Sequence, residues 1–485
     1  MFQTNVNIET PQNIEICCIR NVWLCRVVED SIRPQFCDLH LAGGRISEIR
    51  PADYRRYLQG RAPDGAAGPD HGSFAGSAVG PEAAAGQTDC GAVIDAAARV
   101  ATVPAVNFHE HLYSRLAKGL TLPGPMDSFR SLLANLWWRL DEALDEPMVE
   151  ACAYLGAAQS LHRGVTYVFD HHSSPAFVRG SLDTLARILG TAGLRSVLCL
   201  ETSDRHEETI TRACLEEQRR FLQRSCNADL HGLVGLHAPF TLSDATLQHA
   251  ASLCRERSAG IHIHLAEDRY EQTYSRETFG CSATERLQRF GLLERPGIVA
   301  HGVHLQEEEW RILAGARCAL AVNPDSNLNN AVGLGRYARI PDSLPIVAGT
   351  DGMHASPSRS LKQVFLLHRH RGGSVSESFA LVRRIYSDQL SFVRTFFPDY
   401  PYLNPGDRAD LVIWDYRPAS PFRSETFWGH LIYGILEAPA WTVCMRGRAL
   451  LAAGVLRSFD SESAARLAAV QGERLFCQLG VIDDG

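Results

Sequence analysis

A short apolar run followed by a longer amphipathic stretch repeats along the middle of the chain. Eight such runs lie between residues 103 and 351, and each ends in polar residues. Continuous apolar strands that alternate with helices are typical of a parallel sheet buried on both faces. Eight units that close on themselves predict a (β/α)₈ barrel of about 250 residues. The polar residues at the eight ends are Asn107, His109 and His111, then Asp170, His171 and His172, then Glu201, His237, His264, His301, Asn323 and Asp351.

The segments between and outside these runs complete the predicted α/β fold. Amphipathic stretches predict helices between the strands, at residues 128–144, 147–163, 182–192 and 209–223. Strand-like patterns also flank the barrel on both sides, at residues 22–28, 39–42, 45–49, 92–95, 411–414 and 442–451. We expect these N- and C-terminal strands to pair with each other and form one small β-sandwich domain.

The expected domain boundaries follow from these patterns. Residues 14–104 and 404–455 form the two parts of the β-sandwich, residues 105–400 form the barrel, and residues 456–485 form a C-terminal helical tail. Within the first part, residues 62–89 are mostly Gly, Ala, Pro and Ser. This stretch cannot bury enough apolar surface to offset its ordering entropy, so we expect a flexible surface insertion.

Composition excludes several classes of protein. Among 485 residues, 48 are Lys or Arg and 55 are Asp or Glu, which gives a net charge of -7 with no basic cluster for binding nucleic acid. No apolar run approaches the ~18 residues of a membrane span, and the N-terminal residues lack the apolar region of a signal peptide. We therefore expect a cytoplasmic protein with no membrane partner. The 14 cysteines form no C-x-x-C pair, which favours buried free thiols.

The histidines and one aspartate at the strand ends predict a metal site. His109 and His111 alternate along a strand end, so both side chains point to the same side. His264, His301 and Asp351 end three further strands, and in this barrel the active site lies at the carboxyl ends of the strands. Imidazole and carboxylate ligands suit Zn²⁺ or Fe²⁺, and the sequence does not choose between the two ions.

Four motifs occur in a characteristic order. They are H-x-H at residues 109–111, H-x-x-E at 264–267, A-H-x-V-H at 300–304 and G-T-D-G at 349–352. With them the chain resembles the metal-dependent amidohydrolase superfamily, in its chlorohydrolase and deaminase branch. The Trp-Trp pair at 137–138 and the asparagine-rich stretch at 323–330 make it most similar to SsnA-type aminohydrolases. The similarity extends from about residue 22 to residue 451.

The resemblance implies roles for the metal-site residues. The metal would sit on His109, His111, His264 and Asp351, with His301 close by or as a fifth ligand. A metal lowers the pKa of bound water from 15.7 towards ~7 and thereby supplies hydroxide at neutral pH. Asp351 can take the proton of this water, and His301 can orient the attacking hydroxide. Glu267 would carry a proton to a ring nitrogen and then to the departing amine.

Further residues are candidates for contact with the substrate. We predict that His237 hydrogen-bonds a carbonyl or exocyclic group. Either His171 or His172 faces the substrate, with His172 taken as the contact, or both support the metal ligands. Trp138 would stack on a planar heterocycle, whereas packing into the core is the alternative for either Trp137 or Trp138. Two arginines, Arg115 and Arg130, either grip an anionic substituent or are solvated.

Lysine usage bears on the number of metal ions. The chain has only two lysines, Lys118 and Lys362, and neither lies on the third or fourth barrel strand. Binuclear members of the superfamily bridge two metals with a carbamylated lysine at a strand end. This chain has no lysine for that bridge, so we expect one metal ion, Zn²⁺ or Fe²⁺.

The sequence thus predicts a mononuclear, metal-dependent hydrolase that cleaves a C–N bond of a small heterocyclic substrate. Two alternatives stay open. One is a chlorohydrolase-type displacement of another leaving group, and the other is a non-catalytic scaffold with the amidohydrolase fold. The presence of Glu267 favours deamination, and the complete ligand set favours an enzyme. The resemblance also implies a homodimer.

Overall fold

The computed structural model describes residues 8, 14–29, 31–60, 85–88, 91–224 and 227–482. All eight predicted apolar runs form strands, so this part of the prediction is confirmed. They are β7 (Ala105–Glu110), β8 (Val165–His172), β9 (Arg195–Leu200), β11 (Val234–Leu236), β12 (Ile261–Leu265), β13 (Gly297–His301), β14 (Cys318–Val322) and β15 (Ile346–Ala348). Every residue of β8, β9, β12, β13 and β14 is buried, as the continuous apolar pattern requires.

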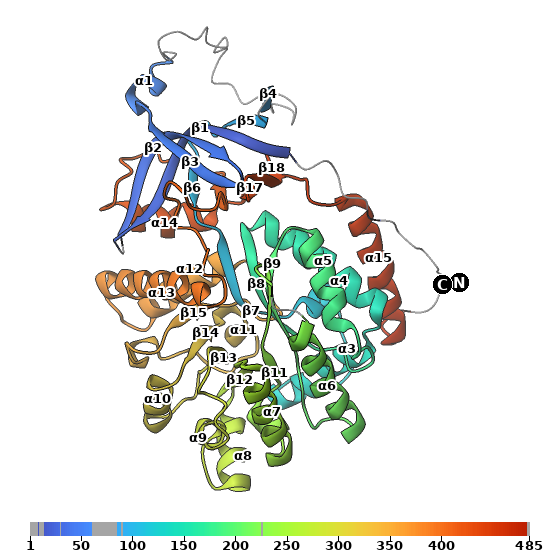
Figure 1. The fold of residues 1–485 in the computed structure, drawn as a ribbon. Helices are drawn as coiled ribbons and strands as arrows, with labels where there is room; N and C mark the ends of the chain where they lie inside the picture. The colour runs from blue at the N-terminus through green and yellow to red at the C-terminus, as the bar shows by residue number, and fades with distance from the viewer. Residues whose placement is uncertain are drawn as a thin grey trace.

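The eight strands pair in parallel within two sheets. One sheet has the order β10-β9-β8-β7, where β10 is Leu230–Gly232, and the other has the order β11-β12-β13-β14-β15. Isolated parallel bridges join the sheets at both edges, between Glu110 and Asp351 and between Thr202 and Leu236. The carboxyl ends of all eight strands therefore lie on one side, where the polar residues of the pattern are found (Figure 1).

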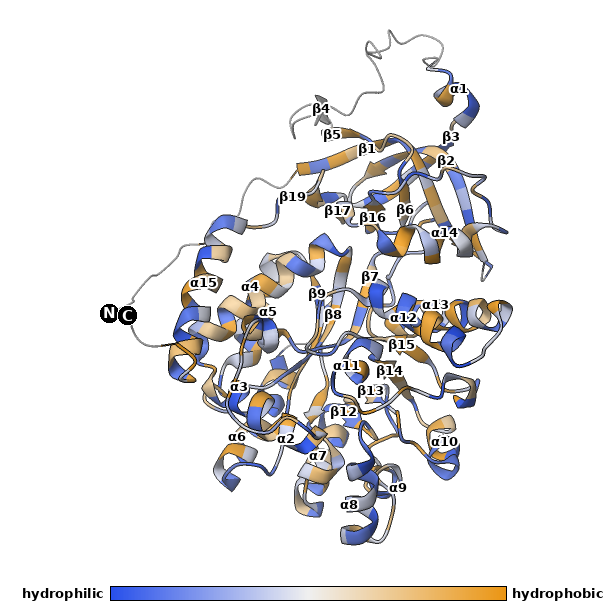
Figure 2. Ribbon diagram, turned by 180° about the vertical axis from the view of Figure 1, so that it is seen from behind, coloured by the Kyte–Doolittle hydropathy of each residue, from blue (hydrophilic) through white to orange (hydrophobic). Residues whose placement is uncertain are grey.

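Helices follow most of these strands and cover their outer faces (Figure 1). Many begin at a side chain that caps the first turn, such as Asp145, which accepts a hydrogen bond from the backbone N–H of Met148. In Figure 2 the outlying helices α6, α8 and α9 carry many hydrophilic residues. The helices are α4 (Glu146–His162), α5 (Ser181–Thr191), α6 (Glu208–Arg224), α7 (Asp244–Arg257), α8 (Arg269–Phe279), α9 (Ala283–Arg289), α10 (Glu307–Ala314), α11 (Pro324–Asn329), α12 (Pro357–His370) and α13 (Val375–Phe396).

The first predicted helix is divided. Residues 128–144 contain α2 (Phe129–Leu132), a π-helical turn at Leu133–Trp137 and α3 (Trp138–Ala143). A π turn inserts an extra residue, which rotates the side chains after it relative to those before it. Both neighbouring tryptophans, Trp137 and Trp138, reach the same pocket in this arrangement.

Strands from the two ends of the chain belong to a single sheet of ten strands. Its main order is β19-β18-β17-β16-β6-β1-β2-β3; in addition, β5 pairs with β1, and β4 pairs with β5. The predicted pairing of N- and C-terminal segments is present, because β6 pairs antiparallel with β16 (Figure 1). The strands are β1 (Ile14–Val28), β2 (Ser31–Ala42), β3 (Arg45–Pro51), β4 (Ala85–Thr88), β5 (Gly91–Asp95), β6 (Val100–Thr102), β16 (Leu411–Trp414), β17 (Ala440–Met445), β18 (Arg448–Ala452) and β19 (Val455–Leu456).

Strand β1 begins eight residues earlier than the predicted start at residue 22. Its pairing with β2 shifts between Ile19 and Val22, and Asn21 has a φ of 52° inside this shift. A bulge of this kind interrupts the alternation of apolar and polar positions, so the pattern hides the first half of the strand.

The remaining elements lie near the ends and connections of the chain. The predicted tail helix is α15 (Ser461–Gln478), which packs against α4 (Figure 1). Two further helices are α1 (Tyr54–Leu58) and α14 (Phe427–Tyr433), and short 3₁₀ turns occur at Leu112–Ala117, Pro239–Thr241, Tyr337–Arg339 and Ile435–Glu437. The predicted insertion at 62–89 lies outside the described residues except for β4.

Two compositional predictions can be compared with the described residues. No helix among them is both long and apolar enough to span a bilayer. Their ten buried cysteines are free thiols, as predicted: Cys18, Cys25, Cys37, Cys152, Cys199, Cys214, Cys254, Cys281, Cys318 and Cys444.

Candidate metal centre and pocket

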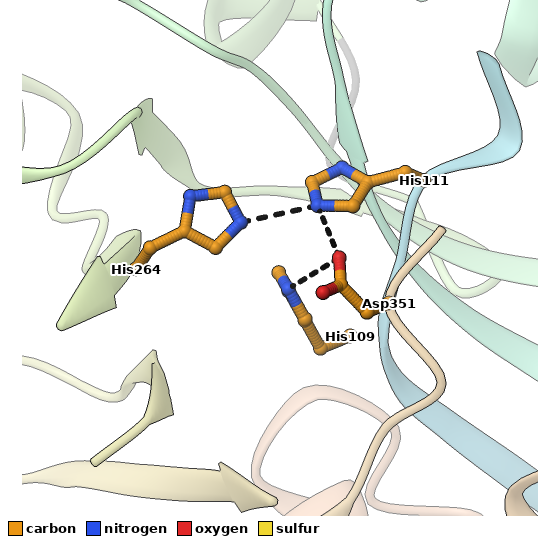
Figure 3. A group of neighbouring side chains, drawn as sticks. All are labelled: His109, His111, His264 and Asp351. Carbon is orange, nitrogen blue, oxygen red and sulfur yellow. Dashed lines mark hydrogen bonds and ion pairs between the residues drawn. The ribbon is translucent and has the colours of Figure 1, made fainter. Parts of the chain in front are cut away.

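Four predicted metal ligands converge where the two parallel sheets meet (Figure 3). His109 and His111 come from the end of β7, His264 from β12 and Asp351 from the segment after β15. One potential ligand atom from each lies within 4.8 Å of the others. The Nε2 atom of His111 is 3.1 Å from Nε2 of His264 and 2.8 Å from Oδ1 of Asp351. Residues about 240 positions apart in the chain thus form one compact cluster.

Hydrogen bonds at the outer nitrogens orient two of these imidazoles. Nδ1 of His111 lies 2.6 Å from the carbonyl oxygen of His171, and Nδ1 of His264 lies 2.9 Å from that of His237. A carbonyl only accepts, so Nδ1 carries the hydrogen in both rings and the lone pair is on Nε2, which faces the cluster. This arrangement is typical of metal-binding histidines.

The third histidine provides a direct test of whether the residues fit a metal ion. Nδ1 of His109 lies 2.8 Å from Nε2 of His262, so this outer nitrogen has a partner. Nε2 of His109 is fully buried without any hydrogen bond and lies 3.6 Å from Oδ1 of Asp351. A buried nitrogen of this kind requires a partner, and a cation held between it and the carboxylate would supply one. The donor set therefore fits a divalent metal ion.

Burial and mutual charge favour the ligand forms of these groups. Burial lowers the pKa of His109 to about 4 and that of His264 well below its usual value, so both imidazoles are neutral near pH 7. Burial alone would raise the pKa of Asp351. The charge of His111 and the nearby imidazoles of His109 and His301 instead hold it well below its ordinary value. Burial alone would lower the pKa of His111, but the charge of Asp351 and a hydrogen bond to it raise that pKa to about 9. A cation bound beside Asp351 would displace this added proton and leave His111 in its neutral, ligand form.

His301 lies at the edge of this cluster. Its Nδ1 is 2.9 Å from Oδ1 of Asn327, while its Nε2 is 3.5 Å from Glu267 and 3.7 Å from Asp351. It therefore forms a second group with these two carboxylates. The position agrees with the prediction that His301 lies close to the metal ligands. Asn327 supports its ring.

The backbone is strained beside the cluster. His301 has a φ of 77°, Asp351 a φ of 55° and Ala266, next to Glu267, a φ of 52°. Each such left-handed conformation costs roughly 1–3 kcal/mol for a residue other than glycine, and it persists only where surrounding contacts impose it. Here it turns the chain at the ends of β12, β13 and β15, so that the functional side chains there face the same space.

Glu267 faces the pocket beside the metal cluster. Its side chain is buried, and Oε1 accepts a hydrogen bond of 3.2 Å from Nδ2 of Asn330. Burial raises the pKa of this carboxyl group. A carboxyl group with a raised pKa next to a reacting centre can both donate and accept a proton near neutral pH.

The pocket at the carboxyl ends of the strands encloses about 660 Å³ between its atoms, part of it open to solvent. The predicted residues Trp138, His237 and Glu267 line it together with three of the metal-site residues. The ring of Trp138 meets that of His237 edge-on, with centroids 6.3 Å apart. The apolar wall of the pocket suits a planar ring. It consists of Phe129, Leu133, Trp137, Trp138 and Phe240.

Part of the pocket wall is acidic, and its residues belong to none of the sequence motifs. Glu201 follows β9, lines the pocket and approaches Nε2 of His237 at 4.0 Å. Arg205 reaches both Glu201, at 3.4 Å, and Asp141, at 2.6 Å. Burial raises the pKa of Glu201 to about 7, against the charge of Arg205. From the sequence, the only signal for Glu201 was its place at the end of a strand.

Several candidate contacts lie elsewhere. His172 is fully buried, bonds to Oγ of Ser174 at 2.8 Å and is absent from the pocket lining, so the structure does not bring it to the substrate side. On the same strand, β8, the ring of His171 lies close to the carbonyls of Leu236 and His262, and the carbonyl of His171 accepts a hydrogen bond from His111. Arg115 is buried in an ion pair with Glu110, and Arg130 lies over the ring of Tyr270. Neither arginine lines the pocket, and Arg130 is exposed to solvent, which agrees with the solvated alternative for this residue.

Comparison with known proteins assigns the family. The sequence profile of the Amidohydrolase family matches residues 104–439, more than half of the chain. The chain belongs to the Amidohydrolase family. The predicted superfamily is thereby confirmed, and with it the class of enzyme, a metal-dependent hydrolase of carbon–nitrogen bonds. The narrower similarity to SsnA-type aminohydrolases stays a prediction.

Curated relatives of this amidohydrolase include two deaminases. The 5-methylthioadenosine/S-adenosylhomocysteine deaminase of Desulforudis audaxviator is 27% identical over 391 residues, which cover 79% of this chain and 88% of that protein. The 5'-deoxyadenosine deaminase of Methanothermobacter thermautotrophicus is 27% identical over 397 residues, which cover 78% of this chain and 88% of that protein.

Solved structures share the fold of this amidohydrolase. An adenosine deaminase from Xanthomonas campestris with bound zinc aligns with a TM-score of 0.72 at 18% identity, covering 95% of this chain and 99% of that one. Atrazine chlorohydrolase TrzN from Arthrobacter aurescens TC1, complexed with zinc, aligns with a TM-score of 0.72 at 17% identity, covering 94% and 100%. The predicted divalent metal ion is supported by the cluster of His109, His111, His264 and Asp351 and by membership of the Amidohydrolase family.

Proposed function

We propose that this amidohydrolase is a mononuclear zinc deaminase that releases ammonia from a small nitrogen heterocycle. The observation that carries the proposal is the cluster of His109, His111, His264 and Asp351, with the carboxyl group of Glu267 beside it in the same pocket. Deaminase relatives at 27% identity support the reaction type. The reaction exchanges an exocyclic amino group for oxygen, so that the amino-heterocycle and water yield the oxo-heterocycle and ammonia.

The fold behind this proposal is a closed (β/α)₈ barrel with a small β domain. The bridges at both edges of the two parallel sheets support closure of the barrel. The pairing of β6 with β16 supports one β domain, with the chain divided at 14–104, 105–400, 404–455 and 456–485 as expected. We also infer a homodimer in the cytoplasm from the family resemblance, and sedimentation equilibrium of the purified protein measures the oligomeric state directly.

Four residues would hold the ion: His109, His111, His264 and Asp351. When bound, Zn²⁺ supplies Lewis-acid chemistry that makes water acidic enough to act as a nucleophile near neutral pH. Asp351 has a second oxygen, Oδ2, that can take a proton from this water. His301 lies 3.7 Å from that oxygen and can hold the water in line with the pocket.

Glu267 would transfer the protons of the reaction. It can deliver its proton to a ring nitrogen next to the reacting carbon. After it takes up a proton that comes from the attacking water, it can deliver that second proton to the departing amine. Burial raises its pKa, which favours the protonated form that a proton donor requires. Trp137 and Trp138 would stack on the ring and hold its plane against the metal cluster.

The experiment that tests this function is a screen for ammonia release by the zinc-loaded protein with aminopurines, pterins, aminopyrimidines and triazines. We expect release from at least one compound, and loss of activity after removal of zinc by a chelator with recovery on adding it back. The chlorohydrolase alternative is favoured by the TrzN-like fold alone, and chloride release from chlorotriazines without ammonia release would support it. A protein that binds no metal and releases neither product would be a scaffold.

A further inference from the structure

Glu201 is a buried carboxylate in the pocket wall whose hydrogen-bonding capacity is largely unused. Its side chain is 3% exposed, and among the described residues its carboxylate accepts one hydrogen bond, from Arg205 at 3.4 Å. A carboxylate has about four lone-pair sites, and buried polar groups are normally satisfied. Burial raises the pKa of this carboxyl group to about 7, so its ionised form is accessible near neutral pH. In that form both oxygens retain capacity for hydrogens that a ligand brings.

Two imidazole lone pairs face the same carboxylate. Nε2 of His171 lies 3.0 Å from the carbonyl of Leu236 and 3.1 Å from that of His262, so the hydrogen is on Nε2. The lone pair is then on Nδ1, which is buried without a partner and lies 3.6 Å from Oε2 of Glu201. Acceptors facing one another repel unless a group between them supplies hydrogens.

The proton position on His237 is also determined by its neighbours. Thr241 donates its hydroxyl hydrogen to the carbonyl of Ala238, so its Oγ1 accepts from Nδ1 of His237, 2.8 Å away. Nε2 of His237 is therefore an acceptor, and it lies in the pocket 4.0 Å from Oε1 of Glu201. A neutral His237 would accept a hydrogen bond from the substrate. Of the two partners that the sequence predicted, this suits an exocyclic amino group and not a carbonyl.

The acceptor atoms of His171, Glu201 and His237, here called the acceptor wall, lie beside the reacting centre. Potential ligand atoms of His171, Glu201 and His264 lie within 4.8 Å of one another, and His264 is one of the proposed zinc ligands. A group so close to the metal contacts the reacting ring itself, not a substituent several bonds away. Glu267 is held by Asn330 and Glu201 by Arg205, so the two carboxylates belong to different walls.

We propose that Glu201 and His237 bind an N–H edge of the reacting ring, and that the substrate is a guanidine-type heterocycle. In such a ring the amino-bearing carbon lies between a ring N–H and a second ring nitrogen. Glu201 accepts a hydrogen bond from the N–H, and Glu267 protonates the second nitrogen. Guanine and isocytosine have this arrangement, whereas an adenine-type ring has a carbon in place of the N–H. The inference rests on the proposed function and narrows its substrate.

A second metal ion is the other species that could satisfy these acceptors. It would need Nε2 of His264, because Nδ1 of that ring is engaged with the carbonyl of His237. The lone pair on Nε2 already points to the cluster of His111 and Asp351. One lone pair does not serve two ions, so the geometry favours substrate N–H groups.

The test compares matched probes on the zinc-loaded, full-length protein. Ammonia release is measured with guanine and isocytosine, and with adenosine and 5'-deoxyadenosine as adenine-type probes. We expect kcat/KM for the better guanidine-type probe to exceed that for either adenine-type probe by at least about tenfold. Glu201→Gln should lower kcat/KM for the guanidine-type probe by roughly 10–100-fold, mainly through KM, with zinc content and thermal unfolding midpoint unchanged.

Glu217→Gln is the control variant. Glu217 is a buried glutamate on α6 that pairs with Arg220, away from the pocket, so the same chemical change there should leave kcat/KM unaltered. If Glu201→Gln does not fold, the substrate preference of the unaltered protein still decides the question.

Three results would overturn the inference: preference for an adenine-type probe, equal kcat/KM in a folded Glu201→Gln protein, or two zinc ions per chain that fall to one in that variant. The first of these leaves the proposed deaminase function intact. Ammonia release from no heterocycle at all would instead remove the proposed function, and this inference with it.

Discussion

Each functional imidazole is positioned by the partner of its outer nitrogen. The carbonyls of His171 and His237 direct the lone pairs of His111 and His264 into the cluster, and Asn327 holds His301. The H-x-H and H-x-x-E spacings predict which histidines are candidates. They do not predict the tautomer, because the deciding partners come from other strands.

Replacing Glu267 tests the proton carrier at the residue scale. Glu267→Gln keeps the size of the side chain and removes its titratable proton, so we expect kcat to fall by roughly 10²–10⁴-fold. Zinc content, measured by plasma emission spectroscopy, should stay at one ion per chain. Asp268→Asn is the matched control, since Asp268 caps α8 through the N–H of Tyr270 and asparagine caps equally well. A Glu267→Gln enzyme with unchanged kcat would show that another group carries the proton.

At the scale of elements, the ends of β7, β14 and β15 are packed without space for an extra atom. A Cβ on Gly349, directly after β15, would lie 2.3 Å from Oδ1 of Asn323 and 2.7 Å from Cβ of His109. The glycine of the G-T-D-G motif therefore lets β15 approach β7 closely enough for Asp351 to meet His109 and His111.

Gly349→Ala should displace His109 and weaken the metal site. We expect a loss of stability of about 1–3 kcal/mol from overpacking, together with a zinc dissociation constant at least roughly tenfold higher. Competition with a chromogenic chelator measures the affinity, and urea unfolding measures the stability. Gly190→Ala, in α5 where a Cβ meets nothing within 4 Å, should change neither affinity nor activity. Equal affinity in both variants would contradict the close-packing argument.

At the scale of the whole molecule, the metal site joins the two parallel sheets. His109 and His111 belong to one sheet, while His264 and Asp351 come from the other sheet and its last loop. An ion bound by all four side chains would link the first and last strands of the proposed barrel and would bind only the folded chain.

Zinc should therefore stabilise the protein against heat. With free zinc at about 100 times its dissociation constant, the folded state gains about 2.7 kcal/mol, and the unfolding midpoint should rise by a few degrees. Differential scanning calorimetry with and without zinc measures the shift. His264→Ala should lose most of it, and a full zinc-dependent shift in that variant would place the ion elsewhere.

The amino-acid sequence by itself determined the eight buried strands and the residues that end them. Periodicity of apolar residues is a local property, so the strand positions, most helices and the candidate ligands could be predicted. The sequence also excluded a bridging carbamylated lysine, because neither Lys118 nor Lys362 lies on a barrel strand. Local patterns were less reliable where a bulge or a π turn changed the period, as at Asn21 and before Trp138.

Only the tertiary structure decided which polar residues meet. His172 and His237 both end strands, yet one is buried behind the wall and the other lines the pocket. Glu201 has no motif around it, and its place between His171 and His237 arises from the neighbouring strands β8 and β11. Contacts across parallel strands join residues far apart in the chain, and their directions depend on register and on backbone turns such as that at His301. For that reason the metal-binding residues could be predicted from the sequence, whereas the acceptor wall could not.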